Sequence, residues 1–273
     1  MITGSGGFVG FSLLAEISEL NPIGVAYRFL PNFGRITTCD LRNINEVKKL
    51  FDKIEPKTVF HLAALPNPSI NDKNKKLARE SNVGITENII SNLKDETHQI
   101  FTSTDIVFDG THPCPNEDTP TRPNSFHGEL KVECENIIKM NVKKYHILRL
   151  STIHSMDNSS IISTQKRVTS FINYSLERIR LREKVEAFDN VKRCFCRLNE
   201  LNQLLKFLIN DNHYGIYNVG SPMTSYYDRI RILCEENSIP WERSLVRTEG
   251  FAHPIEQNLN TSKLQKTFNF SFS

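Results

Sequence analysis

The sequence predicts an α/β protein: a doubly wound parallel sheet followed by a smaller C-terminal region. Short apolar runs alternate with helix-spaced apolar patterns six times along the first 150 residues, as parallel strands and crossover helices do. Glycines at positions 4, 7 and 10 stand directly before the first helix-spaced run. We therefore expect a dinucleotide-binding core over 1–150 and a mixed α/β substrate-binding region over 151–273, with a cleft between them.

The composition limits the kinds of partner and bound metal that we expect. The 273 residues are 38% hydrophobic, and 34 basic against 31 acidic residues leave a net charge of +3. So small a charge does not indicate a nucleic-acid or membrane partner. No apolar run approaches the roughly 18 residues of a membrane span. The six cysteines are scattered, and the close pair Cys194 and Cys196 lacks the spacing of a metal site. We expect a cytoplasmic protein with reduced thiols and no bound metal.

The glycine turn predicts a Rossmann-type phosphate site. Gly4 permits a tight bend after a strand, Gly7 lets backbone N–H groups approach a pyrophosphate, and Gly10 lets the helix over 8–20 pack closely. A dinucleotide then lies at the helix N-terminus, which begins with Phe8 and Val9. The alternative is an ordinary glycine-rich turn. Because three residues precede Gly4 and the chain stops after 268–273 without a helix cap, we also expect that a few residues are missing at both ends.

The next two strands bear on cofactor choice. The strand over 22–27 ends at Arg28, with no acidic residue at its tip. An acidic residue there would bind the ribose 2′-hydroxyl of NAD, whereas arginine accepts the 2′-phosphate of NADP. Arg28, with Arg35 as a second candidate, favours NADP over NAD, the alternative being a surface arginine. Asp40 and Leu41 follow the strand over 36–39, where an adenine could lie.

Three further strands and two helices complete the predicted core. The strand over 57–64 ends in Ala63 and Ala64 against a ligand, and its His61 is expected to be a buried core residue. A long helix over 71–93 carries Asn82 on its inner face. The strand over 99–104 delivers two hydroxyl groups, from Ser103 and Thr104, at the end where ligands bind in open α/β sheets. A helix over 125–140 and a strand over 145–150 follow.

Beyond residue 150 the alternation loosens. We expect helices over 165–182, 198–209 and 226–236, and a strand over 215–219. Arg193, Arg197 and His253 are candidate contacts for a diphosphate or a sugar, although each is more often a solvated charge.

These motifs together resemble the extended short-chain dehydrogenase/reductase family. The segments that carry the resemblance are Thr3-Gly4-x-x-Gly7-x-x-Gly10, Asp40-Leu41, His61-Leu62-Ala63-Ala64, Asn82-Val83 and Ser103-Thr104-Asp105-x-Val107-Phe108-Asp109-Gly110. The last segment, with Gly215-Ile-Tyr-Asn-Val219-Gly220 and Leu259-Asn-Thr-Ser-Lys263-Leu, is similar to the dTDP-4-dehydrorhamnose reductase branch. That branch also includes the regulatory β subunit of methionine adenosyltransferase, which keeps the fold and binds NADP but serves another enzyme.

The resemblance implies the catalytic residues. It makes Thr104 the catalytic hydroxyl and Lys131 the lysine that also holds the nicotinamide ribose. The family's tyrosine position, four residues before that lysine, is occupied by His127, with Gly128 confirming the register. The i, i+4 spacing places His127 and Lys131 on one helix face.

The chemistry requires a proton donor beside a sugar carbonyl while hydride arrives from the nicotinamide. Histidine, with an ordinary pKa of about 6.5, can give a proton at neutral pH. However, imidazole is shorter than a phenol, and Lys131 favours its neutral form, which is not an acid.

Two hypotheses follow. One is an NADPH-dependent reductase of a nucleotide-linked 4-keto-6-deoxy sugar, with His127 as the acid. The other is an NADP-binding regulatory or sensor protein with weakened or lost catalysis. We expect a nucleotide-sugar substrate and a homodimer, or instead a complex with a partner enzyme if the chain is regulatory. An epimerase or dehydratase is a lesser alternative.

Overall fold

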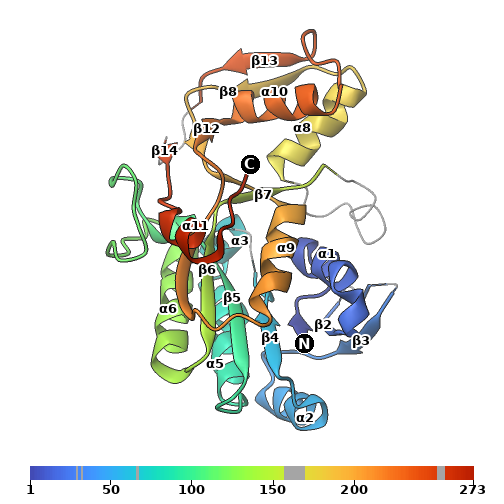
Figure 1. Ribbon diagram of the computed structural model, residues 1–273, viewed down its shortest axis with the longest axis vertical. Helices are drawn as coiled ribbons and strands as arrows, with labels where there is room; N and C mark the ends of the chain where they lie inside the picture. Colours follow the sequence, from blue (N-terminus) through green and yellow to red (C-terminus); the bar gives the residue numbers. More distant parts are fainter. Residues whose placement is uncertain (29, 32, 66–67, 157–169, 251–255) are drawn as a thin grey trace.

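A seven-stranded parallel sheet organises the core of the molecule (Figure 1). The computed structural model describes residues 1–28, 30–31, 33–65, 68–156, 170–250 and 256–273. The sheet order is β11-β6-β5-β4-β1-β2-β3. The strands are β1 (Ile2–Thr3), β2 (Ile23–Ala26), β3 (Arg35–Thr38), β4 (Thr58–His61), β5 (His98–Thr104), β6 (Tyr145–Leu150) and β11 (Gly215–Val219). The chain winds from β1 through β3 in one direction and from β4 through β6 in the other, so the predicted doubly wound sheet is confirmed.

Helices cover both faces of this sheet, because successive strand residues point in opposite directions. Phe60, Ile100 and Leu148 belong to a core that includes α1 (Phe8–Glu16) and α9 (Leu198–Leu208). Their neighbours Phe101 and Ile147 pack with α6 (Phe126–Asn141) on the other face. On that face α5 (Ile85–Ile90) contacts both α6 and α2 (Ile44–Ile54).

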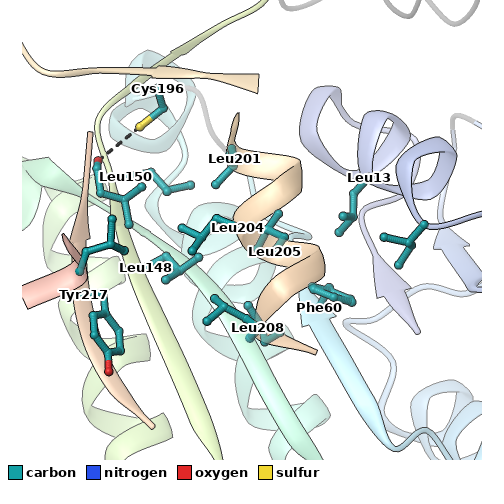
Figure 2. Packing of buried hydrophobic residues seen from close by; sticks show 14 of the residues in the cluster. Leu13, Phe60, Leu148, Leu150, Cys196, Leu201, Leu204, Leu205, Leu208 and Tyr217 are labelled. Atoms are coloured by element: carbon teal, nitrogen blue, oxygen red, sulfur yellow. Dashed lines mark hydrogen bonds between the residues drawn. The ribbon is translucent and has the colours of Figure 1, made fainter. Parts of the chain in front are cut away.

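The leucines of α9 join the sheet to α1 (Figure 2). Leu201, Leu204, Leu205 and Leu208 are fully buried at the i, i+3, i+4, i+7 spacing of one helix face. They lie between Leu13 of α1 and the strand residues on that face. The first helix of the core is therefore packed against a helix that follows it by almost 190 residues.

The remaining elements form a second cluster beyond the carboxyl ends of the strands (Figure 1). It contains α8 (Phe171–Arg180), α10 (Tyr226–Glu236) and the parallel pair β8 (Val185–Phe188) and β13 (Leu245–Thr248). Short strands connect it to the core: β7 (Thr152–His154), β9 (Lys192–Arg193), β10 (Phe195–Arg197), β12 (Thr224–Ser225) and β14 (Glu256–Gln257). Helix α11 (Ser262–Phe268) packs against β11. A boundary between two domains at residue 150 stays a prediction, since β11 and α9 return to the core.

The helix predicted over 71–93 is wrong as one continuous element. It consists of α3 (Pro68–Lys73), α4 (Lys75–Arg79), a π-helical turn (Glu80–Gly84) and α5. Asn74 interrupts it because its side chain accepts a hydrogen bond from Leu77 N at 3.0 Å and so starts a new helix. The helix predicted over 165–182 is observed as α8, and residues 165–169 lie outside the described part.

The structure also bears on the cysteines and on membrane spans. All six cysteines are free thiols. Among the described residues, no helix is both long and apolar enough to cross a membrane.

Candidate functional site

The site begins where β1 and β4 end side by side, at the point where the strand order reverses. Thr3 Oγ1 accepts hydrogen bonds from Leu62 N at 3.1 Å and Ala63 N at 3.2 Å, which joins the two loops. Gly4 has φ +68°, and a Cβ there would lie 2.8 Å from Ala63 N. Only glycine fits this bend without displacing the loop that carries Ala63 and Ala64.

The other two glycines of the turn have different surroundings. A Cβ on Gly10 would lie 2.3 Å from Gly4 O, so α1 packs directly on the turn. A Cβ on Gly7 would meet Gly4 O at 3.2 Å, and apart from its chain neighbours nothing else in the described structure lies within 4 Å. Gly7 is also the N-cap of α1, with no side-chain cap and no acidic residue in the first turn. The N–H groups of Phe8, Val9 and Gly10 therefore begin a helix with space in front of it, which suits a phosphate.

Basic residues gather at the ends of β2 and β3. The Arg28 and Arg42 guanidinium carbons each lie 5.2 Å from the centre of the Tyr27 ring. Asp40 binds Arg42 through two hydrogen bonds, at 2.9 and 2.7 Å, and this bidentate contact is the largest factor that holds the pKa of Asp40 below its usual range. Sequence analysis singled out Arg28 and Asp40 but missed Arg42, whose position two residues after Asp40 is the one signal that could have indicated it.

Asn82 lies in the π-helical turn, a feature that often marks functional sites. Its Nδ2 donates to Ala78 O at 2.8 Å, while its buried Oδ1 has no partner among the described residues. His61 is buried as expected, and its Nε2 is 2.9 Å from Thr86 Oγ1. Burial, with a smaller effect of Lys131, lowers the pKa of His61 to about 3, so this imidazole is neutral.

The hydroxyl of Thr104 is engaged inside its own loop. Thr104 Oγ1 donates to Asp105 Oδ1 at 3.2 Å and accepts from Ile106 N at 3.4 Å. Asp105 is buried, which raises the pKa of its carboxyl group, and its Oδ2 accepts from Ser151 Oγ at 2.7 Å. A substrate oxygen at this point would have to replace Asp105 as the acceptor of the Thr104 proton.

Lys131 reaches the same strand end from α6. Its Nζ donates to Thr102 O at 2.8 Å and lies 4.6 Å from the centre of the Phe101 ring. Burial lowers the pKa of this amine. Helix α6 approaches closely because position 128 is glycine: a Cβ there would lie 2.5 Å from Ile106 O. This contact places the start of α6 beside the loop that follows Thr104.

His127 precedes that glycine and is 7% exposed. Its Nδ1 is 2.8 Å from Asn71 Nδ2, a contact between α6 and α3 that the sequence did not indicate. Burial and then Lys131 lower the pKa of His127 to about 4. At neutral pH the imidazole is therefore uncharged, and the direction of this shift is the one expected from the positive charge of Lys131. A neutral imidazole lacks the proton that an imidazolium would donate as an acid.

The C-terminal candidates lie in different settings. Arg193 is in β9, and its charge acts on Asp105, which brings it to the edge of the site. Arg197 is engaged with Glu236, with Nη2 to Oε2 at 2.5 Å. His253 lies outside the described residues. The structure thus brings the glycine turn, Ala63, Asn82, Thr104, His127 and Lys131 to the carboxyl ends of adjacent strands, whereas Arg28, Asp40 and Leu41 lie around the outer strands β2 and β3.

Comparison with known proteins gives one family and several relatives. Residues 1–270 match the family described as the RmlD substrate binding domain. The chain is 29% identical over 158 residues to the methionine adenosyltransferase 2 subunit beta of Xenopus tropicalis. That match covers 56% of this chain and 46% of the frog protein, so the chain aligns with less than half of this relative.

Solved structures with the same fold share less sequence. A dTDP-4-dehydrorhamnose reductase from Bacillus anthracis in complex with NADP has a TM-score of 0.79 and 20% identity, covering 99% of this chain and 93% of that one. A UDP-glucose 4-epimerase from Thermotoga maritima with UDP-glucose has a TM-score of 0.83 and 16% identity, covering 100% and 93%. At these identities the likeness establishes the fold. A UDP-glucose 4-epimerase from Thermus thermophilus, another structure of this fold, is a complex with NAD.

Proposed function

Because the chain belongs to the family of the RmlD substrate binding domain, we propose that it is a nicotinamide-dinucleotide-binding protein that acts as a regulatory subunit. In this proposal its keto-sugar reductase site lacks a working proton donor. The observation that carries the proposal is His127, a buried neutral imidazole at the position where the resemblance expects a tyrosine.

The turn supports the dinucleotide. The space in front of Gly7 and the uncapped first turn of α1 suit a pyrophosphate, with Phe8, Val9 and Gly10 as N–H donors. Ala63, Ala64, Asn82 and Lys131 would border the nicotinamide end. A nicotinamide group, when bound, supplies or accepts a hydride. The residues of this chain would bind and orient it, and the Oδ1 of Asn82, which has no partner among the described residues, would accept from one of its donors.

The charges at the ends of β2 and β3 favour NADP over NAD. Arg28 is exposed on one side of Tyr27, with no acidic residue at the end of β2. Arg42 adds a second guanidinium, although Asp40 already neutralises much of its charge. Arg28 is therefore the stronger candidate for a 2′-phosphate, and Asp40 with Leu41 would border the adenine.

The lack of an acid argues against efficient reduction of a sugar ketone. Hydride addition leaves a negative oxygen that must be protonated. A neutral imidazole donates a hydrogen bond but releases its proton only at very high pH, and the Thr104 hydroxyl is directed to Asp105. We therefore expect weak or no turnover.

The partner is proposed from the curated relatives. Methionine adenosyltransferase 2 subunit beta is by its name one subunit of a larger enzyme. We propose that this chain assembles in the cytoplasm with an enzyme of the methionine adenosyltransferase class. Co-purification of the full chain with that enzyme, with and without NADPH, tests the assembly.

The test of the cofactor and of catalysis uses purified protein. Calorimetric titration should give binding of NADPH, and a turnover assay with a dTDP-4-keto-6-deoxy sugar should give no oxidation of NADPH. No binding of either NADPH or NADH would overturn the proposal.

A second candidate is a working nucleotide-sugar reductase. The retained Lys131 and the placement of Thr104 favour it, because a chain that no longer performs catalysis has less need of both. Sustained NADPH oxidation that depends on His127 would establish this function in place of the first.

A further inference from the structure

Asn71 and His127 form a buried pair in which the neighbours of the Asn71 amide nitrogen indicate its orientation, while the Asn71 Oδ1 has no partner among the described residues. Asn71 is 0% exposed, and its Nδ2 lies 3.3 Å from Leu65 O and 2.8 Å from His127 Nδ1. A carbonyl oxygen can only accept, so the atom facing Leu65 is the amide nitrogen. With that orientation the amide presents a donor to His127, and Nδ1 must be the acceptor.

An accepting Nδ1 fixes the rest of the ring. In a neutral imidazole one nitrogen accepts and the other carries the hydrogen, so the hydrogen is on Nε2. The charged group that acts on this ring is Lys131, which with burial lowers the pKa of His127 to about 4. From α3 the ring meets the uncharged amide of Asn71. A proton on Nδ1 would place two donors against each other, so the amide and the lysine both oppose the imidazolium.

We propose that Asn71 is a positioning residue that holds His127 as a neutral imidazole whose Nε2–H is the donor offered to a carbonyl or hydroxyl oxygen of a bound ligand. The identity of that ligand rests on the proposed function, whereas the hydrogen position does not. A neutral imidazole can polarise a carbonyl oxygen without transferring its proton. The site would therefore recognise the oxygen of a keto sugar or a ribose and would not complete its reduction.

The test is nuclear magnetic resonance of isotope-labelled histidine in the full chain, with no ligand present. His127 is assigned by comparison with His127→Gln. The wild type should show the Nε2–H form at neutral pH and no titration of His127 between pH 5 and 7, the range around the ordinary value for histidine of about 6.5. Titration in that range, or an Nδ1–H form, would overturn the proposal.

Two substitutions of Asn71 test whether this residue sets the hydrogen position on the His127 ring. In Asn71→Asp the carboxylate accepts from the ring, so the hydrogen should move to Nδ1 and the pKa of His127 should rise by about two units or more. In Asn71→Leu the ring loses its fixed donor and should populate both neutral forms. Asn74→Asp is the matched control, because Asn74 is exposed and caps α4, where aspartate caps equally well. It should leave His127 unchanged.

The outcomes separate this inference from the proposed function. An Asn71→Asp variant with the wild-type hydrogen position and pKa would refute the role of Asn71, whatever the protein binds. Failure of NADPH to bind would refute the proposed function and would leave the inferred hydrogen position on His127 unaffected. If both hold, Asn71→Asp should raise the fraction of charged His127 at neutral pH about a hundredfold, and any reductase rate should rise with it.

Discussion

At the scale of single residues, the three glycines of the first turn differ in what they permit. Gly4 adopts a left-handed backbone conformation, and Gly10 allows α1 to pack against the carbonyl oxygen of Gly4. Gly7 has open space beside its Cα among the described residues, where a ligand can bind. A side chain at Gly10 would meet backbone, which cannot move aside without moving the turn. A side chain at Gly7 would occupy the space that we assign to the pyrophosphate.

Substitutions at these two positions should therefore separate folding from binding. We expect Gly7→Val to fold and to lose NADPH binding, because the valine fills the phosphate space. Gly10→Ala should lower the free energy of unfolding by about 2 kcal/mol or more, since its Cβ overlaps Gly4 O. Urea unfolding and calorimetry measure the two effects. Equal NADPH affinity in wild type and Gly7→Val would contradict the assigned phosphate site.

Arg28 is the residue on which the choice of NADP depends. Arg28→Ala should weaken NADPH binding roughly tenfold, the value of about one charge-assisted hydrogen bond, and leave NADH binding unchanged. Arg35→Ala, on exposed β3, serves as the comparison for the weaker candidate. If Arg28→Ala weakens both cofactors equally, Arg28 makes no contact with a 2′-phosphate.

At the scale of elements, a buried ion pair joins α6 to β6. Arg149 binds Glu135 with Nη2 to Oε2 at 2.8 Å, and Ser103 Oγ donates to Glu135 Oε1 at 2.6 Å. Both charged side chains are almost fully buried. Because α6 also carries His127 and Lys131, this pair fixes the helix that supplies two of the site residues to β6, and the bond from Ser103 ties the same helix to β5, which ends at Thr104.

Removing one partner of this ion pair should lower the free energy of unfolding more than replacing both partners with apolar residues. Arg149→Met leaves Glu135 as a buried unpaired charge and should lower the free energy of unfolding by about 3 to 5 kcal/mol. The double variant Glu135→Leu with Arg149→Met should recover most of that loss. Arg79→Met, which breaks the exposed pair with Glu133, should cost at most about 1 kcal/mol. A double variant no more stable than Arg149→Met would contradict this account.

Elements were predictable from sequence where a local signal decides them. The strands of the core and α1, α6 and α9 follow from apolar periodicity and caps such as Ser125. The segment 71–93 shows the limit, because its polar periodicity hides a cap at Asn74 and a π-helical turn at Asn82. The short strands after residue 150 have two to four residues, too few for a pattern to show.

At the scale of the whole molecule, several histidines are buried as neutral rings. Burial is the main cause that lowers the pKa of His61 and His154 to about 3 and that of His98 and His127 to about 4. His98 Nε2 lies 2.7 Å from His146 Nδ1, a contact that cannot hold when both rings are charged. Protonation therefore opposes the fold.

The direction in which pH changes the folding stability follows from the difference in proton binding between the folded and the unfolded chain. Between about pH 6.5 and 4 the unfolded chain binds protons at these rings and the folded chain does not, so stability falls as pH falls through that window. Each ring contributes about 1.4 kcal/mol per pH unit. Urea unfolding at several pH values measures the slope, and His98→Gln should reduce it. The same slope in His98→Gln, or stability that is flat between pH 6.5 and 4.5, would contradict the neutral rings.

The site as a whole could be predicted only in part. The positions of Gly4, Gly7 and Thr104 follow from a glycine turn and from the end of a strand, whereas Lys131 was indicated by the family resemblance alone. The partner of His127 was not, because Asn71 precedes it by 56 residues and no pattern links them. Arg42 was missed for a similar reason, since its place beside Tyr27 depends on how two loops meet.

The most direct test of the central claim compares wild type with His127→Tyr in NADPH oxidation on a dTDP-4-keto-6-deoxy sugar, with NADPH binding measured in both. We predict that both bind NADPH, that the wild type shows little or no turnover, and that His127→Tyr gains activity, because a phenol beside Lys131 can supply the proton. Robust wild-type turnover that is abolished in His127→Ala would contradict this claim and would show that His127 works as the acid.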